Sequence, residues 1–226
     1  MPDDYYKNIP MAQRLRQAYA CAPPRVKQYL DAEIEFVADH IKSTDYLLEL
    51  GCGYGRVIEK LAVRAALAVG IDISADSLKL AAESIWPRRN LHYCLMDAGA
   101  QGFKKETFDL VVCIQNGISA IKTDPQDLIS ESISVLKENG SALFSSYLDR
   151  FWPYRIEWFE IQADLGLIGP IEWEKCGDGV IVCKDGFRAT TFSPNRFVEI
   201  AHKLGLAYLI TEIDDSAVFC EYRRRN

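Results

Sequence analysis

The stretch at residues 47–56 carries the clearest chemical signal in the sequence. It reads Leu-Leu-Glu-Leu-Gly-Cys-Gly-Tyr-Gly-Arg, so an apolar run containing an acid leads into three glycines at alternate positions. Glycine is favoured where the backbone takes a positive φ or where a ligand touches the main chain. A glycine turn between a parallel strand and a helix is a common nucleotide-cofactor site. The stretch therefore indicates a cofactor site.

Two acids follow later apolar runs at positions that suit a nucleoside. Asp72 lies about 20 residues after the glycines, which is the spacing of a carboxylate that accepts ribose hydroxyls. Asp72 could also cap the segment after Ile73, and the two roles are compatible. Asp97 could accept a hydrogen bond from the exocyclic amine of adenine, or form a turn before Ala98 and Gly99. Both positions favour a ligand that contains a nucleoside.

A parallel sheet would bring these residues together. Apolar runs predict strands at residues 46–50, 67–71, 91–96, 109–114 and 142–147. Ligands bind such sheets outside the carboxyl ends of the strands. The glycine turn, Asp72, Asp97 and the pair Gln115 and Asn116 all follow strand ends, so we expect them at one edge.

Helical segments separate these strands. We expect helices at residues 25–41, 56–63 and 125–137, another between Ser74 and Pro87, and a helix stop at Gly140. After the fifth strand, residues 148–193 are rich in aromatic side chains and contain turn sequences typical of hairpins.

The end of the chain departs from the parallel pattern. A last helix should begin at Ser193 and Pro194, and two strands at 206–213 and 217–222 follow. The link between these strands is so short that they must be antiparallel. The predicted fold is therefore α/β: a seven-stranded, mostly parallel sheet with a C-terminal antiparallel hairpin, helices on both faces, and a small insert between strand five and the last helix. We expect one domain over residues 1–226, with 1–44 as an N-terminal helical cap and 148–193 as the insert.

Composition narrows the classes of partner. The net charge of −6 makes nucleic acid an unlikely partner, and no apolar segment is long enough to span a membrane. The seven cysteines are scattered without a C-x-x-C pair, which favours reduced thiols and no metal site. Residues 1–5 are acidic and lack a secretory apolar core, so we expect a cytoplasmic location. None of the three histidines is placed to act as a catalytic base, and nothing in the sequence indicates an oligomeric state.

The glycine pattern distinguishes between two kinds of cofactor. Aligning Gly51 and Gly53 with the dinucleotide fingerprint G-x-G-x-x-G/A places Arg56 where a small residue is needed. The terminal hairpin also departs from a plain dinucleotide domain. The function of an NAD-dependent oxidoreductase is therefore only the alternative prediction.

The segment from Glu49 to Arg56 resembles the first motif of the class I S-adenosylmethionine-dependent methyltransferases. Asp72, Asp97 and the strand ending near Asn116 fall where the later motifs of that family lie. The ordered set is more specific than the first motif alone. The resemblance covers roughly residues 25–147 and 194–222, and it implies S-adenosylmethionine as the cofactor.

The resemblance also implies a role for each residue of the site. The methionine end would be held by the backbone of Gly51, Cys52 and Gly53, by Glu49 at the amino group and by Arg56 at the carboxylate. The nucleoside would be held by Asp72 at the ribose, Ile73 at the adenine face, and Asp97 with Ala98 at the adenine edge. Gln115 and Asn116 would border the sulfonium and methyl group.

The resemblance implies methyl transfer to a small-molecule acceptor by in-line displacement. The Asn/Asp-Pro-Pro-aromatic motif common in nucleic-acid amino-methyltransferases is replaced by Gln115, Asn116, Gly117 and Ile118. A protein methyltransferase and a non-catalytic cofactor-binding protein remain alternatives. The insert at 148–193 could recognise the acceptor, or could form a subsidiary core or a dimer contact. Tyr5, Tyr6 and Tyr19 could close the pocket or simply pack.

Overall fold

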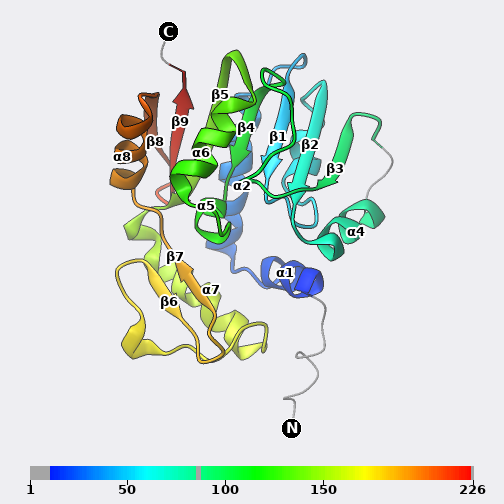
Figure 1. The fold of residues 1–226 in the computed structure, drawn as a ribbon. Helices are drawn as coiled ribbons and strands as arrows, with labels where there is room; N and C mark the ends of the chain where they lie inside the picture. Colours follow the sequence, from blue (N-terminus) through cyan, green and yellow to red (C-terminus); the bar gives the residue numbers. More distant parts are fainter. Residues whose placement is uncertain (1–10, 85–87, 225–226) are drawn as a thin grey trace.

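A seven-stranded sheet forms the centre of the computed structural model, which describes residues 11–84 and 88–224 (Figure 1). The strand order is β3-β2-β1-β4-β5-β9-β8. The strands are β1 (Tyr46–Leu50), β2 (Leu67–Asp72), β3 (Leu91–Leu95), β4 (Phe108–Cys113), β5 (Leu136–Tyr147), β8 (Ala207–Ile213) and β9 (Ala217–Arg223). The first five are parallel, and β9 is antiparallel to both β5 and β8. The predicted sheet and its closing hairpin are confirmed.

Helices cover both faces of the sheet. One face packs against α2 (Pro24–Asp39), α3 (Ile58–Leu61) and α4 (Ala75–Ser84). The other packs against α5 (Gly117–Ala120), α6 (Pro125–Ser134) and α8 (Pro194–Leu204). Central strands such as β4 are apolar because both of their faces are buried.

Two predicted helices are shorter than expected. The helix predicted at 56–63 is reduced to the single turn of α3. The helix predicted at 125–137 ends at Ser134, and Gly140 lies within β5 instead of stopping a helix. The physical reason is burial and pairing: Val135 and Leu136 are buried, and the carbonyl of Val135 accepts bonds from the backbone N–H groups of Thr107 and Phe108. Strand pairing therefore outweighs local helix propensity there.

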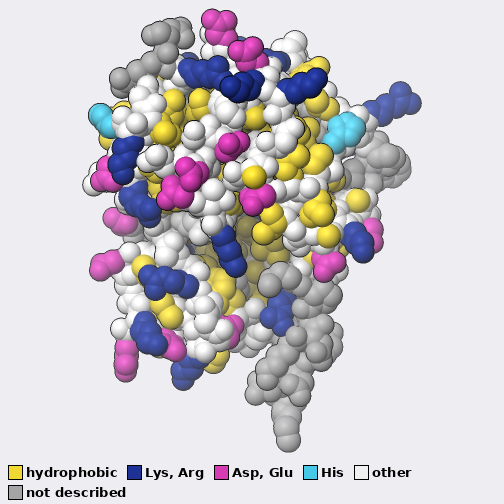
Figure 2. Space-filling model, viewed as in Figure 1, with side chains coloured by type: hydrophobic (Ala, Val, Ile, Leu, Met, Phe, Trp, Pro, Cys, Tyr) yellow, Lys and Arg dark blue, Asp and Glu magenta, His cyan; other side chains and the backbone are white. Residues whose placement is uncertain are grey.

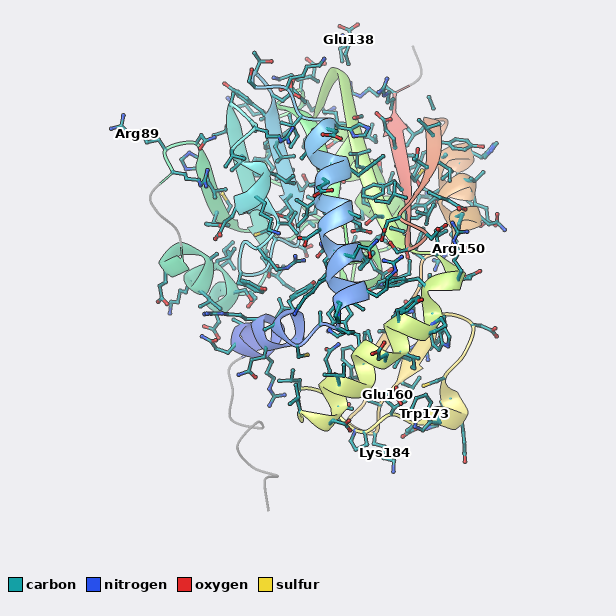
Figure 3. The ribbon with its side chains drawn as sticks, turned by 180° about the vertical axis from the view of Figure 1, so that it is seen from behind. Arg89, Glu138, Arg150, Glu160, Trp173 and Lys184 are labelled. Carbon is teal, nitrogen blue, oxygen red and sulfur yellow. The ribbon has the colours of Figure 1, made fainter. Side chains whose placement is uncertain are left out.

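The insert forms a small unit below the carboxyl ends of the strands. It contains the 3₁₀ turns η2 (Asp149–Phe151) and η3 (Trp173–Lys175), helix α7 (Trp152–Asp164), and the two-stranded sheet of β6 (Val180–Val182) and β7 (Arg188–Thr190). Its aromatic residues share a core with Tyr29 and Leu30 of α2. Figure 3 shows Arg150 at the end of the insert next to the main sheet and Trp173 near its far end.

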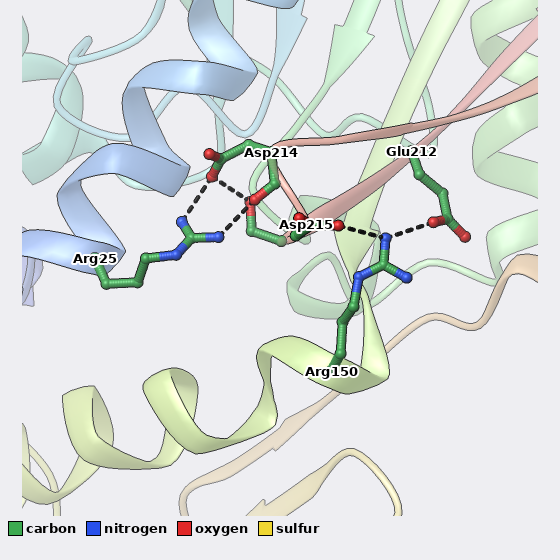
Figure 4. A network of polar contacts seen from close by, with 6 residues as sticks. Arg25, Arg150, Glu212, Asp214 and Asp215 are labelled. Atoms are coloured by element: carbon green, nitrogen blue, oxygen red, sulfur yellow. Dashed lines mark hydrogen bonds and ion pairs between the residues drawn. The ribbon is translucent and has the colours of Figure 1, made fainter.

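Ion pairs fix both α2 and the insert to the turn between β8 and β9 (Figure 4). Arg25 of α2 lies 2.6 Å from the carboxylate of Asp214. Arg150 of the insert lies 2.6 Å from Glu212 and 3.2 Å from Asp215. The terminal hairpin thus anchors the elements that flank the carboxyl edge of the sheet.

The N-terminal helix α1 (Met11–Ala20) lies against the same edge. The indole Nε1 of Trp158 in α7 donates a 2.8 Å hydrogen bond to the carbonyl of Ala18, so α1 and the insert are in contact. None of the helices in the described part of the chain has the length and apolar character needed to cross a bilayer.

Candidate functional site

A cavity of about 400 Å³ opens at the carboxyl ends of β1 to β4. Ligand-binding pockets typically have volumes of about 300–1,000 Å³. Figure 2 shows hydrophobic side chains deep in a hollow between the main sheet and the insert. The lining includes every residue expected at the cofactor site except Asn116: Glu49, Gly51, Cys52, Gly53, Arg56, Asp72, Ile73, Asp97, Ala98 and Gln115.

The glycine turn is fixed to the end of β2. Gly51 and Gly53 have φ values of 69° and 53°, in the region that favours glycine. The backbone N–H of Cys52 donates to the carbonyl of Ile71 over 2.9 Å, and that of Gly53 donates to Asp72 Oδ2 over 2.8 Å. Main chain therefore forms this wall of the cavity, as the glycine spacing predicted.

Asp72 makes two backbone hydrogen bonds. Besides Gly53, it accepts a 2.8 Å bond from the N–H of Ser74 through Oδ1. The cap-like contact proposed as an alternative is thus present. Each carboxylate oxygen can accept more than one bond, so Asp72 can still accept from ligand hydroxyls at the cavity wall.

Glu49 is a buried acid that faces the cavity. Its side chain is 5% exposed, and its Oε2 is buried without a hydrogen-bond partner. Burial raises the pKa of Glu49 to about 8, while the nearby Arg56 and the N–H of Ile58 act in the opposite direction. A cationic group in the cavity would find an acceptor here.

Arg56 links the glycine turn to the end of β4 and to α1. Its Nη2 donates to Gln115 Oε1, and its guanidinium lies 4.1 Å from the ring centroid of Tyr19. Its Nε is buried and has no hydrogen-bond partner. Tyr19 and Leu15 of α1 line the cavity, whereas the other two proposed lid residues, Tyr5 and Tyr6, lie outside the described residues.

The opposite end of the cavity has an apolar wall. Ile73 is 71% exposed, and Met96, Ala98 and Ile121 also line the space. Asp97 Oδ1 accepts a 2.8 Å bond from the N–H of Gly99, which is the turn offered as the alternative to adenine recognition. A flat aromatic base would fit this apolar wall, with Asp97 at its edge.

The turn after β4 has an unusual backbone. Gln115 and Asn116 have φ values of 57° and 61°, and two consecutive non-glycine residues in this region are uncommon. The N–H of Gln115 donates to Glu33 Oε2 over 2.6 Å and to Ser145 Oγ over 2.8 Å. Side chains of α2 and β5 therefore hold the strained turn that lines the cavity.

Asn116 does not line the cavity, contrary to the prediction. Its Nδ2 donates to the carbonyl of Thr190, and its Oδ1 accepts from Ser146 and Ser119. The left-handed turn directs the amide toward the insert. Asn116 thus ties the turn after β4 to β7.

Glu33 is the polar residue of this region that the sequence reading missed. It is fully buried, and its Oε1 has no hydrogen-bond partner. Burial raises the pKa of Glu33 to about 8 despite hydrogen bonds from Ser145 and Gln115 and the nearby Arg56. The sequence did contain a signal that Glu33 is buried. It lies four residues after Tyr29 and seven after Val26, on the apolar face of α2.

Comparison with known families agrees with this geometry. A family model described as a methyltransferase domain matches residues 47–140, which run from β1 into β5 and include the glycine turn and the ends of β2, β3 and β4. This segment therefore matches a methyltransferase domain, and the chain has the fold of solved S-adenosylmethionine-dependent methyltransferases. Glu33 lies in α2, outside the segment that the family model matches.

The individual relatives of this chain are distant. A ubiquinone biosynthesis O-methyltransferase of Coxiella burnetii is 25% identical over 144 residues, which are 63% of this chain and 58% of the relative. The match thus spans less than two thirds of that relative's length. The solved PH0226 protein of Pyrococcus horikoshii superposes with a TM-score of 0.66 at 21% identity, covering 90% of this chain and 93% of the other. A structure described as a DhpI-SAM-HEP complex gives a TM-score of 0.65 at 17% identity and covers 94% of each chain.

Proposed function

We propose that the protein transfers a methyl group from S-adenosylmethionine to a small-molecule acceptor. The observation that carries this proposal is the buried carboxyl group of Glu49, whose Oε2 has no hydrogen-bond partner, beside a glycine turn fixed by Asp72. A pyrophosphate at that turn would face two acids, which is unfavourable for a dinucleotide. A ligand with an ammonium and a sulfonium gains from the same acids.

The residues present fit this cofactor. Glu49 would accept from the ammonium of the methionine end, and the Nε of Arg56 would meet its carboxylate. Asp72 would accept the ribose hydroxyls, and the adenine would lie on the wall of Ile73 and Ala98. All of these residues line the same cavity.

When bound, S-adenosylmethionine supplies a methyl group on a positive sulfur, which becomes a neutral thioether as the acceptor's lone pair forms the new bond. The contribution of this chain is to align the partners and exclude water. Alignment alone can supply about 7–11 kcal/mol in favourable cases. Tyr19 and Leu15 would shield the site, and Gln115 would border the reacting groups. An acceptor that loses a proton would release it to solvent or to a base.

We also propose that the methyl acceptor is bound by the cap at residues 1–44 and the insert at 148–193. Their support is that Tyr19 of α1 lines the cavity and contacts Trp158 of the insert, with ring centroids 5.8 Å apart. The cysteines are all unpaired, which supports the proposed cytoplasmic location.

Isothermal titration calorimetry with S-adenosylhomocysteine and with NAD tests the cofactor assignment. Binding of the first without the second is expected. The reverse result would overturn the proposal in favour of an oxidoreductase. A turnover panel should begin with hydroxyl-bearing metabolites, because the Coxiella burnetii relative is described as an O-methyltransferase.

A further inference from the structure

Arg155 is a buried cation that the proposed cofactor site does not use. Its side chain is 1% exposed, and among the described residues it is the only buried lysine or arginine. It lies in α7 of the insert, beside Tyr147 at the end of β5.

The hydrogen bonds of Arg155 satisfy only part of its guanidinium. Nη1 donates to the carbonyl of Gly179 over 2.8 Å and to Thr191 Oγ1 over 2.7 Å, and both acceptors are neutral. Nε and Nη2 are buried and have no hydrogen-bond partner. No ion pair within the described residues includes Arg155. A purely structural role, in which Arg155 links α7 to the ends of β6 and β7, accounts for the hydrogen bonds of Nη1. It does not account for the edge formed by Nε and Nη2.

Aromatic rings surround this cation. The guanidinium carbon lies 4.6 Å from the ring centroid of Tyr147, 5.6 Å from Phe159 and 5.7 Å from Trp152. Cation–π contacts of this kind offset part of the desolvation cost. These contacts do not supply hydrogen-bond acceptors for the N–H groups of Nε and Nη2. An unpaired charge in the protein interior is costly.

A chain of polar groups connects Arg155 with the cavity. The ring of Tyr147 lies 5.1 Å from that of Tyr29, and the buried hydroxyl of Tyr29 interacts with both Tyr147 and Glu33. Tyr29 is one helical turn before Glu33, which binds the N–H of Gln115 at the cavity wall. A row of buried polar side chains thus links the unsatisfied edge of Arg155 with the cavity wall at Gln115.

We propose that the Nε–Nη2 edge of Arg155 binds an oxyanion of the methyl acceptor, and so selects acidic small molecules. This inference rests on the proposed methyltransferase function. The two N–H groups lie on one edge of the guanidinium, which matches the two oxygens of a carboxylate or a phosphonate. The aromatic residues around it suit a planar or apolar acceptor body. The acceptor would enter past Tyr19, which separates the cavity from Trp158.

Calorimetry on the protein saturated with S-adenosylhomocysteine tests this proposal. The probes are two pairs of an acid and a neutral partner: benzoate with benzamide, and phenylphosphonate with benzyl alcohol. At least one acid should bind about tenfold or more tightly than its partner, because charge-assisted hydrogen bonds are worth about 1.5–3 kcal/mol. The pair that shows the preference identifies the oxyanion. The net charge of −6 disfavours non-specific anion binding.

Variants attribute the preference to one side chain. Arg155→Gln should abolish it, Arg155→Lys should reduce it, and both should bind S-adenosylhomocysteine as the wild type does. Arg150→Gln is the matched control, because Arg150 is half-exposed and pairs with Glu212. Equal binding of acids and neutral partners to the wild type overturns the proposal, as does an unchanged preference in Arg155→Gln. If that variant fails to fold, the wild-type comparison and Arg155→Lys decide. Absence of S-adenosylhomocysteine binding by the wild type would instead refute the proposed function.

Discussion

At the scale of single residues, the two acids of the glycine turn differ in what they already bind. Asp72 accepts backbone N–H groups through both oxygens, from Gly53 and from Ser74. Glu49 Oε2 is buried without a hydrogen-bond partner. Asp72 therefore fixes the shape of the glycine turn, whereas Glu49 has an oxygen available to a ligand.

Asp72→Asn should weaken S-adenosylhomocysteine binding by roughly 1–3 kcal/mol, because hydrogen bonds to a charged acceptor become neutral ones. Isothermal titration calorimetry measures the change. Asp76→Asn, an exposed position in the first turn of α4, serves as the control and should bind like the wild type. An unchanged affinity in Asp72→Asn would refute the ribose assignment.

Glu49 should release a proton when the cofactor binds. Its pKa of about 8 leaves it largely protonated near neutral pH, and an ammonium ligand lowers that pKa, so the carboxyl ionises. Titrations with S-adenosylhomocysteine near pH 7, in buffers with different ionisation enthalpies, count the protons released. Glu49→Gln should remove the release. If the measured binding enthalpy of the wild type is the same in all buffers, Glu49 does not release a proton on binding.

At the scale of elements, helix α2 does more than cover the sheet. Glu33 projects from its buried face to the N–H of Gln115, and the carbonyl of Leu30 accepts from Gln115 Nε2 over 3.2 Å. The left-handed turn after β4 thus depends on an element outside the matched family segment.

Glu33→Gln should flatten the pH dependence of stability. The pKa of Glu33 is about 8 in the folded protein against an ordinary 4.5, so the folded state holds its proton more tightly. The free energy of unfolding therefore falls as the pH rises from about 5 to about 8, and glutamine removes that share of the fall.

Urea unfolding at a series of pH values measures this effect. Glu35→Gln, an exposed position on the same helix, should leave the slope unchanged. Glu49 has a similar raised pKa, so the slope of Glu33→Gln should be reduced but not zero. A slope equal to that of the wild type would show that Glu33 is not held protonated by burial.

At the scale of the whole molecule, segments far apart in the sequence meet at the border of the cavity. Tyr19 of α1 stacks on Arg56 and contacts Trp158 of the insert. The turn between β8 and β9 holds α2 and the insert through the ion pairs of Figure 4. Changes in the insert should therefore affect how long the cofactor is retained.

Trp158→Phe should speed the dissociation of S-adenosylhomocysteine by about 2- to 10-fold, the equivalent of one hydrogen bond, because α1 loses the bond at Ala18. Stopped-flow displacement measures the rate. Trp173→Phe is the control, since this tryptophan is 56% exposed near the far end of the insert. Equal rates in both variants would show that α1 is not held by this contact.

The sequence by itself determined the sheet, its closing hairpin and most of the residues that line the cavity. Apolar runs, glycine spacing and acids at strand ends are local signals, and parallel strands bring their carboxyl ends to one edge whatever the loops do. Tertiary structure decided the rest. Burial of Val135 and Leu136 ended a helix early, and the left-handed turn moved Asn116 out of the cavity. The roles of Glu33 and Arg155 depend on tertiary packing. Residues from distant positions bury both side chains, and this burial raises the pKa of Glu33 and leaves two nitrogens of Arg155 without hydrogen-bond partners.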